Sequence, residues 1–183
     1  MKKRSIVTDD LAGVVIREER AGDWEAVNDL ITLAFSPMPF SSGTEAAIAT
    51  SLRQSGAAVV ALVAEQAGNV VGQVLFSPAF IADRPSSWHA MGPMAVAPTF
   101  QRMGLGSRLI GEGLERLKTM GSEGCIVLGS PAYYQRFGFQ LAPSLAPAGL
   151  PADHFMVLPF GRTPPTEVLA FHPAFEIEAA VSE

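Results

Sequence analysis

The order of secondary structure between residues 88 and 128 constrains the fold more than any other feature of the sequence. Residues 88–96 are typical of a strand, and residues 125–128 form a second, short apolar strand. Between them, from Gly104 onward, apolar residues recur at helical spacing; they are Leu105, Leu109, Leu114 and Leu117. A strand, a helix and a strand in this order join two parallel neighbours of one sheet. The sequence therefore predicts an α/β domain.

The strands that precede this unit indicate antiparallel pairing. Residues 57–66 are apolar and β-branched, and residues 70–76 return after the turn signal Gly68-Asn69. We expect a loop over residues 78–87 and a bulge at Gly92-Pro93, a pair that is unusual inside a strand. Parallel and antiparallel pairs together predict a mixed, mostly antiparallel sheet with flanking helices.

Helices are expected on both sides of these strands. Asp23 is a plausible N-cap for a helix that ends near residue 35, and a second helix begins at Thr44. A brief helix is expected over residues 133–137, and Gly138 ends it. Further short strands are predicted at residues 14–16, 155–158 and 167–171.

Length and composition fit one domain. The chain has 183 residues, of which we assign 13–175 to the domain, 1–12 to an N-terminal tail and 176–183 to a C-terminal tail. Apolar residues make up 48% of the chain, which excludes global disorder. The net charge of −5 argues against a protein that binds nucleic acid by neutralising phosphates.

Secretion and membrane insertion are not indicated either. The single cysteine, Cys125, cannot form an internal disulfide, so a reducing compartment fits. The longest apolar run, residues 57–64, is much shorter than the roughly 20 residues that a membrane span needs. Residues 2–4 are basic, but no apolar segment follows them. We predict a cytoplasmic protein.

The stretch from Gln101 to Gly106 carries the chemistry. It reads Gln-Arg-Met-Gly-Leu-Gly and joins a strand to a helix. A helix start offers unpaired backbone N–H groups, and glycine lets the backbone approach an anion, so a diphosphate is a natural ligand. The alternative is a helix that merely begins after a Gly-rich turn. The dinucleotide fingerprint is excluded because it needs glycine at Leu109, and no P-loop triplet is present.

At this point the chain resembles the GCN5-related N-acetyltransferases, the GNAT family, whose acetyl-CoA signature is [QR]-x-x-G-x-[GA] after a V-x-P-like strand end. Residues 94–98 (Met-Ala-Val-Ala-Pro) followed by residues 101–106 match that signature, and residues 134–139 (Tyr-Gln-Arg-Phe-Gly-Phe) match a second family feature. The combination is similar to a bacterial branch of predicted N-acetyltransferases. The resemblance covers about residues 13–175 and implies an acyl-CoA N-acyltransferase fold with a sheet that splays beyond the signature strand.

The resemblance also implies how acetyl-CoA would bind. The backbone of Met94, Ala95 and Val96 would pair with the pantetheine arm as an added strand. The pyrophosphate would lie on backbone N–H groups of the helix start, with Gln101 and Arg102 adding side-chain donors. The backbone groups expected there are those of Arg102, Met103, Gly104, Leu105, Gly106 and Ser107.

Tyr134 is the candidate general acid that the resemblance implies. A phenol is protonated at neutral pH and can supply the proton that the leaving thiolate needs. The alternative is a packed aromatic residue of a short helix, beside Tyr133, which is also expected at the cofactor site. Ser130 stands where relatives carry Asn or Asp, and it can still hydrogen-bond a pantetheine amide.

The general base and the acceptor site stay open in the sequence. His89 is expected to be a satisfied or surface histidine, and Glu65 or a bound water are alternatives for the base. Residues 36–40, with Met38 and Phe40, are candidates for the acceptor site, the alternative being a turn with partly buried aromatic residues. Arg162 is expected to be a solvated side chain, the alternative being a contact with an acidic acceptor. No metal site is expected, because the histidines and the cysteine lie far apart in the sequence.

These residues predict an enzyme that transfers an acetyl group from acetyl-CoA directly to a primary amine. The alternative is a regulatory or sensor module that binds acyl-CoA with little turnover. The acceptor can be a small amine, an amino acid, an aminoglycoside-like molecule or a protein amine. Neither nucleic acid nor a membrane is expected as a partner, and a homodimer is compatible with the sequence.

Overall fold

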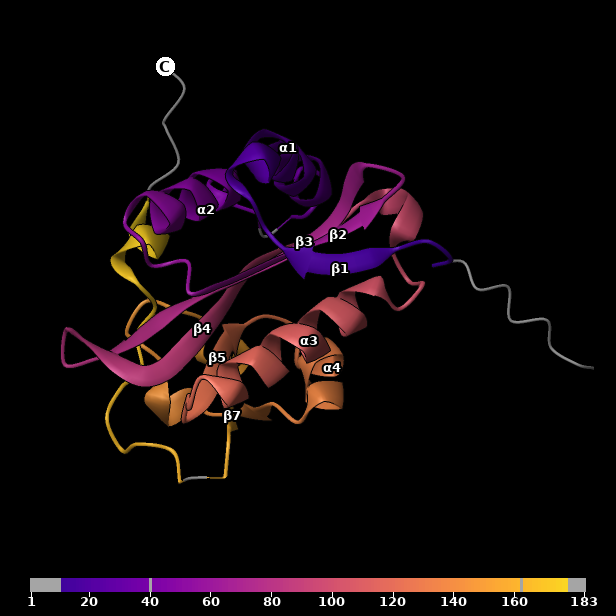
Figure 1. The fold of residues 1–183 in the computed structure, drawn as a ribbon. Helices are drawn as coiled ribbons and strands as arrows, with labels where there is room; N and C mark the ends of the chain where they lie inside the picture. The colour runs from indigo at the N-terminus through magenta and orange to yellow at the C-terminus, as the bar shows by residue number, and fades with distance from the viewer. Residues whose placement is uncertain (1–10, 40, 162, 178–183) are drawn as a thin grey trace, which may run out of the picture.

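The computed structural model describes residues 11–39, 41–161 and 163–177, and Figure 1 shows their arrangement. Phe40, Arg162 and most of the two predicted tails lie outside these residues. Along the chain the elements are β1 (Val15–Glu18), α1 (Trp24–Phe35), α2 (Glu45–Gln54), β2 (Val60–Gln66), β3 (Asn69–Ile81), β4 (Arg84–Val96), α3 (Leu105–Thr119), β5 (Gly124–Leu128), α4 (Pro131–Tyr134), β6 (Gln140–Leu141) and β7 (Phe155–Pro159).

The strands form one mixed sheet, as predicted. Its order is β1-β2-β3-β4-β5-β7-β6, and every neighbouring pair is antiparallel except β4 and β5. Helix α3 makes the crossover between those two parallel strands. Figure 1 shows α1 and α2 on one face of the sheet and α3 on the other.

Each face of the sheet carries its own apolar core. On the α3 face the four predicted leucines of the helix are buried against β2 and β3, and a fully buried leucine contributes about 1.5–3 kcal/mol. On the opposite face, Ile31 of α1 and Leu52 of α2 are buried against the same strands. Leu11, which the sequence places in the N-terminal tail, packs into the core on the α3 face. The sheet is thus fixed from both sides.

The loop expected over residues 78–87 is wrong. Strand β3 continues to Ile81 and β4 begins at Arg84, with a tight turn at Ala82 and Asp83, both of which have positive φ. The pairing of β2 with β3 ends at Phe76, so among the described residues no strand pairs with the tip of the β3–β4 hairpin on the β2 side. Pro78 is tolerated there because the missing N–H leaves no ladder partner unpaired.

Two further predictions need correction. Residues 167–171 do not form a strand; they make one bridge, in which Ala170 and Phe80 exchange backbone hydrogen bonds of 2.8 and 2.9 Å. Asp23 occupies the N-cap position of α1, but its side chain makes no capping bond. Its carboxylate instead accepts two hydrogen bonds from Arg17 and one from the backbone N–H of Arg20, because the guanidinium of β1 offers a stronger, charged donor.

The predicted bulge at Gly92-Pro93 is confirmed. The β3–β4 register places Val74 opposite Met94 but Phe76 opposite Met91, so β4 has one extra residue there. One extra residue reverses the alternation of side chains along a strand. Met91 and Met94, three residues apart, therefore both point into the α3 side of the sheet.

Candidate active site

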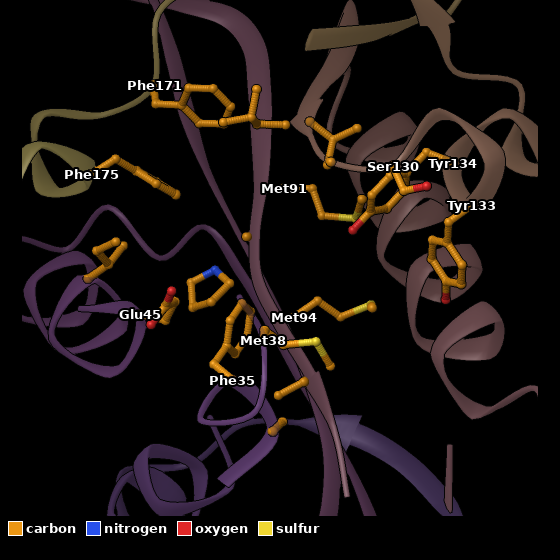
Figure 2. A pocket seen from close by; sticks show the side chains of 18 of the residues that line it. Phe35, Met38, Glu45, Met91, Met94, Ser130, Tyr133, Tyr134, Phe171 and Phe175 are labelled. Atoms are coloured by element: carbon orange, nitrogen blue, oxygen red, sulfur yellow. The ribbon is translucent and has the colours of Figure 1, made fainter. Parts of the chain in front are cut away.

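A cavity of about 790 Å³ opens where β4 and β5 separate. The two strands pair only from Trp88 with Gly124 to Ala90 with Ile126. Beyond Ala90, the edge of β4 has no strand partner on this side among the described residues. The splayed sheet that the family resemblance implies is therefore present, and the cavity occupies the opening. Figure 2 shows β4, marked by Met91 and Met94, running between two groups of wall residues.

The start of α3 forms one end of this cavity. Gly104 occupies the N-cap position with a φ of +89°, a left-handed conformation that side chains other than glycine adopt reluctantly. The first helical hydrogen bond runs from the N–H of Arg108 to the carbonyl of Gly104, at 3.1 Å. The N–H groups of residues 105–107 consequently have no partner within the helix. They form a cluster of donors at the positive end of the helix dipole.

Side chains of the signature reinforce this turn. The amide of Gln101 donates to the carbonyl of Val96 at 3.0 Å, which ties the turn to the end of β4. One of its two amide hydrogens remains for a ligand. Arg102 is exposed and lines the cavity. Gly106 also lines it, and a Cβ built there would lie 2.8 Å from the hydroxyl oxygen of Tyr133.

The structure brings most of the predicted site residues to this cavity. Those that line the cavity are Met94, Ala95, Val96, Gln101, Arg102, Gly106, Ser130, Tyr133 and Tyr134. The others contribute no side chain to the wall. Leu105 is buried in the core, Met103 packs against the core, and Ser107 and Gly104 belong to the turn itself. For these residues the backbone N–H is the group that can reach a ligand, as the signature implies.

Tyr134 directs its hydroxyl into the cavity. Its ring fits against Gly129, where a Cβ would lie 2.5 Å from the ring, and meets Phe139 edge to face. Figure 2 shows the ring directed toward Met91. Burial raises the pKa of Tyr134 above its ordinary value, with the neighbouring Tyr133 adding to the effect. The phenol therefore stays protonated at neutral pH and presents a proton donor.

Tyr133 points a different way. Its hydroxyl lies at the first turn of α3, 2.8 Å from where a Cβ on Gly106 would stand, and its ring lies under the guanidinium of Arg136, 4.5 Å from the ring centre. Figure 2 shows its ring directed away from Met91. Burial raises the pKa of Tyr133 as well. The two adjacent tyrosines thus face separate parts of the site, with Tyr133 at the helix start and Tyr134 in the opening.

The two side chains considered for the general base do not line the cavity. Nδ1 of His89 lies 2.8 Å from the hydroxyl of Ser122, so this residue is a satisfied histidine, as expected. Glu65 accepts two hydrogen bonds from Arg17 at 2.7 and 2.8 Å on the β1–β2 side of the sheet. The ion pair holds Glu65 outside the site, which excludes it as the base.

Sequence reasoning missed three ionisable side chains of the wall. They are Glu45 in the first turn of α2, and His172 and Glu176 near the end of the described chain. The only signal for Glu45 was its place near the start of a helix that follows the predicted acceptor segment. His172 accepts a 3.0 Å hydrogen bond from the N–H of Ala174 through Nδ1, and burial lowers its pKa. Its imidazole is therefore neutral at pH 7.

The remaining wall is apolar. One part of it is the segment 147–150, between β6 and β7. The other part comes from α1, the segment after α1, α2 and the C-terminal segment; there we define the apolar chamber as Phe35, Met38, Ile48, Phe171 and Phe175 together with Glu45. Met38 belongs to the segment expected at the acceptor site, whereas Phe40 of the same segment lies outside the described residues. Figure 2 shows the chamber across β4 from Tyr133 and Tyr134. The cavity therefore has two differently built halves.

Among residues 11–39, 41–161 and 163–177, no three His, Cys, Asp or Glu side chains gather closely enough to hold a metal ion. Within the same residues, no helix has the length and apolarity to cross a bilayer.

Comparison with known proteins places these features in a family. The model of the Acetyltransferase (GNAT) family matches residues 24–139. Two relatives from Escherichia coli K12 are uncharacterised N-acetyltransferases: YhbS, 39% identical over 104 residues, and YjhQ, 37% identical over 119 residues. These matches cover 56% and 63% of this chain, and they span less than two thirds of each relative, 62% and 65%.

Solved structures agree with this placement. A GNAT family acetyltransferase from Brucella melitensis in complex with acetyl-CoA superposes with a TM-score of 0.79, at 37% identity over 88% of this chain and 97% of that protein. Escherichia coli YhbS in complex with CoA gives 0.78, at 31% identity over 90% of this chain and 92% of that one. The segment that the family model matches contains β4, the start of α3 and α4, which build the cavity. The chain belongs to the GNAT family of acetyltransferases.

Proposed function

We propose that the protein transfers the acetyl group of acetyl-CoA to a primary amine. One observation carries the proposal: a single cavity is faced by the unpaired edge of β4, the free N–H groups of α3 and the hydroxyl of Tyr134. These are the groups that an extended amide chain, a diphosphate and a leaving thiolate respectively require. The Brucella melitensis and Escherichia coli YhbS structures, which hold acetyl-CoA and CoA, support the same cofactor here.

In this proposal acetyl-CoA lies along β4. The pantetheine amides bond to the backbone of residues 94–96, and Ser130, on the opposite wall, adds a hydroxyl. The diphosphate lies on the N–H groups of residues 105–107, and the Arg102 side chain adds a charged donor. This pose directs the thioester toward Met91, where the hydroxyl of Tyr134 is aimed.

The reaction is an addition followed by an elimination. The neutral amine nitrogen attacks the thioester carbonyl carbon, and a backbone N–H near Met94 or Val96 stabilises the oxyanion. The carbon–sulfur bond then breaks, and Tyr134 gives its proton to the sulfur. The nitrogen loses one proton to water or to a carboxylate of the wall, so the products are an N-acetylamine and CoA. The apolar cavity disfavours a bare thiolate, which favours protonation of the sulfur. Burial equally disfavours the Tyr134 phenolate, so the proton lost by the nitrogen returns to that oxygen through water.

Cofactor binding is tested by isothermal titration of acetyl-CoA into the wild-type protein and two valine variants. Gly106→Val puts a side chain against Tyr133 and over the helix start, and should weaken acetyl-CoA binding about 10- to 100-fold, the worth of a lost charge-assisted bond. Gly111→Val is the matched control, because it lies in the same helix and a Cβ there meets no atom within 4 Å. Equal affinities in folded Gly106→Val and wild-type protein would contradict the site.

Turnover is tested separately by following thiol release when amines are added to the protein and acetyl-CoA. Release that depends on the amine supports the transferase. Tight acetyl-CoA binding with no release for any amine would contradict the proposed reaction and indicate a binding module instead.

A further inference from the structure

The apolar chamber is built mainly from aromatic and sulfur-containing side chains. Phe171 and Phe175 pack with ring centres 5.0 Å apart, and the Phe175 ring lies against Gly92 in the β4 bulge, 3.7 Å from the position of a Cβ. Phe35 and Met38 supply further wall from the end of α1 and the segment after it. Aromatic rings bury a large apolar area, and methionine adapts its shape to a ligand. Such walls favour a flat apolar body.

One carboxylate interrupts this apolar wall. Glu45 lies in the chamber on the same side of β4 as Phe35 and Phe175 (Figure 2). Its oxygens are held in place by the hydroxyl of Ser41 at 2.8 and 2.9 Å and by the N–H of Ser42 at 3.1 Å. A carboxylate has about four lone-pair sites, so acceptor capacity remains for an incoming cation.

The charges of the described cavity wall favour a cation and disfavour an anion in the chamber. Glu45 and the exposed Glu176 are negative, and the Nδ1 atom of His172 is already occupied by the N–H of Ala174. The single Lys or Arg among the described wall residues is Arg102, at the α3 end of the cavity. An acceptor with a carboxylate would therefore bury an unpaired charge, which is costly. A polyamine suits these charges but has no flat apolar body to fill the space between the rings.

We propose that the acceptor is a small primary amine with an aromatic, uncharged body, such as an arylalkylamine, whose ammonium group is recognised by Glu45. The inference rests on the proposed acetyl transfer and names its substrate class. The aromatic body fills the space between Phe35 and Met38 on one side and Phe171 and Phe175 on the other. The ammonium group is held by Glu45 and releases a proton to solvent before the nitrogen attacks.

The test compares three amines in the thiol-release assay with the full-length protein. Phenethylamine has the proposed form, phenylalanine adds a carboxylate to it, and spermidine replaces the ring with further ammonium groups. We expect kcat/KM for phenethylamine to exceed that for each of the other two by at least about tenfold. Phenylalanine brings a carboxylate that the chamber leaves unpaired, and spermidine has no ring to pack against the aromatic wall. Preferential turnover of phenylalanine or spermidine would overturn the inference but leave the acetyltransferase activity standing.

Two charge-neutralising variants test the role of Glu45. Glu45→Gln keeps an acceptor oxygen for Ser41 and Ser42 but removes the charge, and should lower kcat/KM for phenethylamine about tenfold or more, mainly through KM. The affinity for acetyl-CoA should not change. Asp29→Asn is the matched control on the exposed side of α1, outside the cavity wall, and should retain wild-type values.

A binding measurement decides the inference even without turnover. Phenethylamine is titrated into the complex of the protein with CoA, in wild-type and Glu45→Gln forms. Saturable binding that weakens about tenfold in Glu45→Gln supports the chamber as the amine site. Absence of binding, or equal binding by both forms, overturns it, whereas failure of CoA itself to bind would overturn the proposed function.

Discussion

Replacement of Tyr134 by phenylalanine separates chemistry from packing unusually well in this protein. The ring that packs against Gly129 and Phe139 is retained, and only the hydroxyl is lost. That hydroxyl has no hydrogen-bond partner among the described residues, so its removal leaves no polar group unsatisfied. The free energy of unfolding should therefore change by less than about 0.5 kcal/mol.

The effect on turnover should be large. Without the phenol, the carbon–sulfur bond must break to give an unprotonated thiolate in a cavity that disfavours charge. A positioned general acid is worth about 10²- to 10⁴-fold in rate, which corresponds to about 3–5.5 kcal/mol of the barrier. We expect kcat to fall by this factor at saturating acetyl-CoA and amine, with the Kd for acetyl-CoA unchanged.

The neighbouring tyrosine supplies the control. Tyr133→Phe removes a hydroxyl that lies beside Gly106 at the start of α3, so it should weaken acetyl-CoA binding severalfold and affect kcat less. Thiol release, acetyl-CoA titration and thermal unfolding are measured for both variants. Full turnover in Tyr134→Phe would refute its role as the acid. A loss of kcat confined to Tyr133→Phe would transfer that role to the neighbouring residue.

Three further predictions follow from contacts around the site and in the fold. Gly129→Ala places a Cβ 2.5 Å from the Tyr134 ring, so it should displace the ring and lower kcat at least tenfold, which thiol release measures. Arg53→Met leaves the carboxylate of Glu19 buried without its partner, both side chains being 3% exposed, and should cost about 3–5 kcal/mol in urea unfolding. The Arg17 guanidinium lowers the pKa of Asp23 from 3.8 to about 2; because a depressed carboxyl pKa stabilises the fold above the unfolded value, about 2 kcal/mol should be lost as the pH falls from 4 toward 2. This loss should be absent in Asp23→Asn, and an identical pH profile for both proteins would contradict the assignment.

Local patterns predicted much of the fold. The leucines of α3 and the turn signal at Gly68-Asn69 each depend on residues close together in the sequence, and both are confirmed. The loop predicted at 78–87 is wrong, because strand β3 continues through Pro78 to Ile81. In the structure, Pro78 lies where β3 extends past β2, a condition that depends on the length of another strand. The strand predicted at residues 167–171 is wrong for a similar reason, because pairing there depends on a distant segment. The segment makes one bridge, to Phe80, and one bridge does not make a strand.

The cofactor half of the site could be read from the sequence, whereas the acceptor half could not. The signature from Gln101 to Gly106 lies in the crossover between β4 and β5, and Tyr134 follows β5 directly, so these residues are close together in the sequence. Glu45 and Phe175 are separated by about 130 residues and meet only because both segments cover the same end of β4. Met91 and Met94 point to the same side of the sheet because β4 has a bulge of one residue between them. The sequence indicates this bulge, but only the pairing register of β3 with β4 shows how it turns the two side chains.

The central claim is that this cavity moves an acetyl group from sulfur to nitrogen. The most direct measurement uses acetyl-CoA labelled in the acetyl group, with phenethylamine as acceptor, and follows the label by mass spectrometry alongside thiol release. We expect one labelled N-acetylphenethylamine for each CoA released, and loss of both products together in Tyr134→Phe. Label that stays in acetyl-CoA, or that leaves as free acetate while the amine is unchanged, would contradict the account.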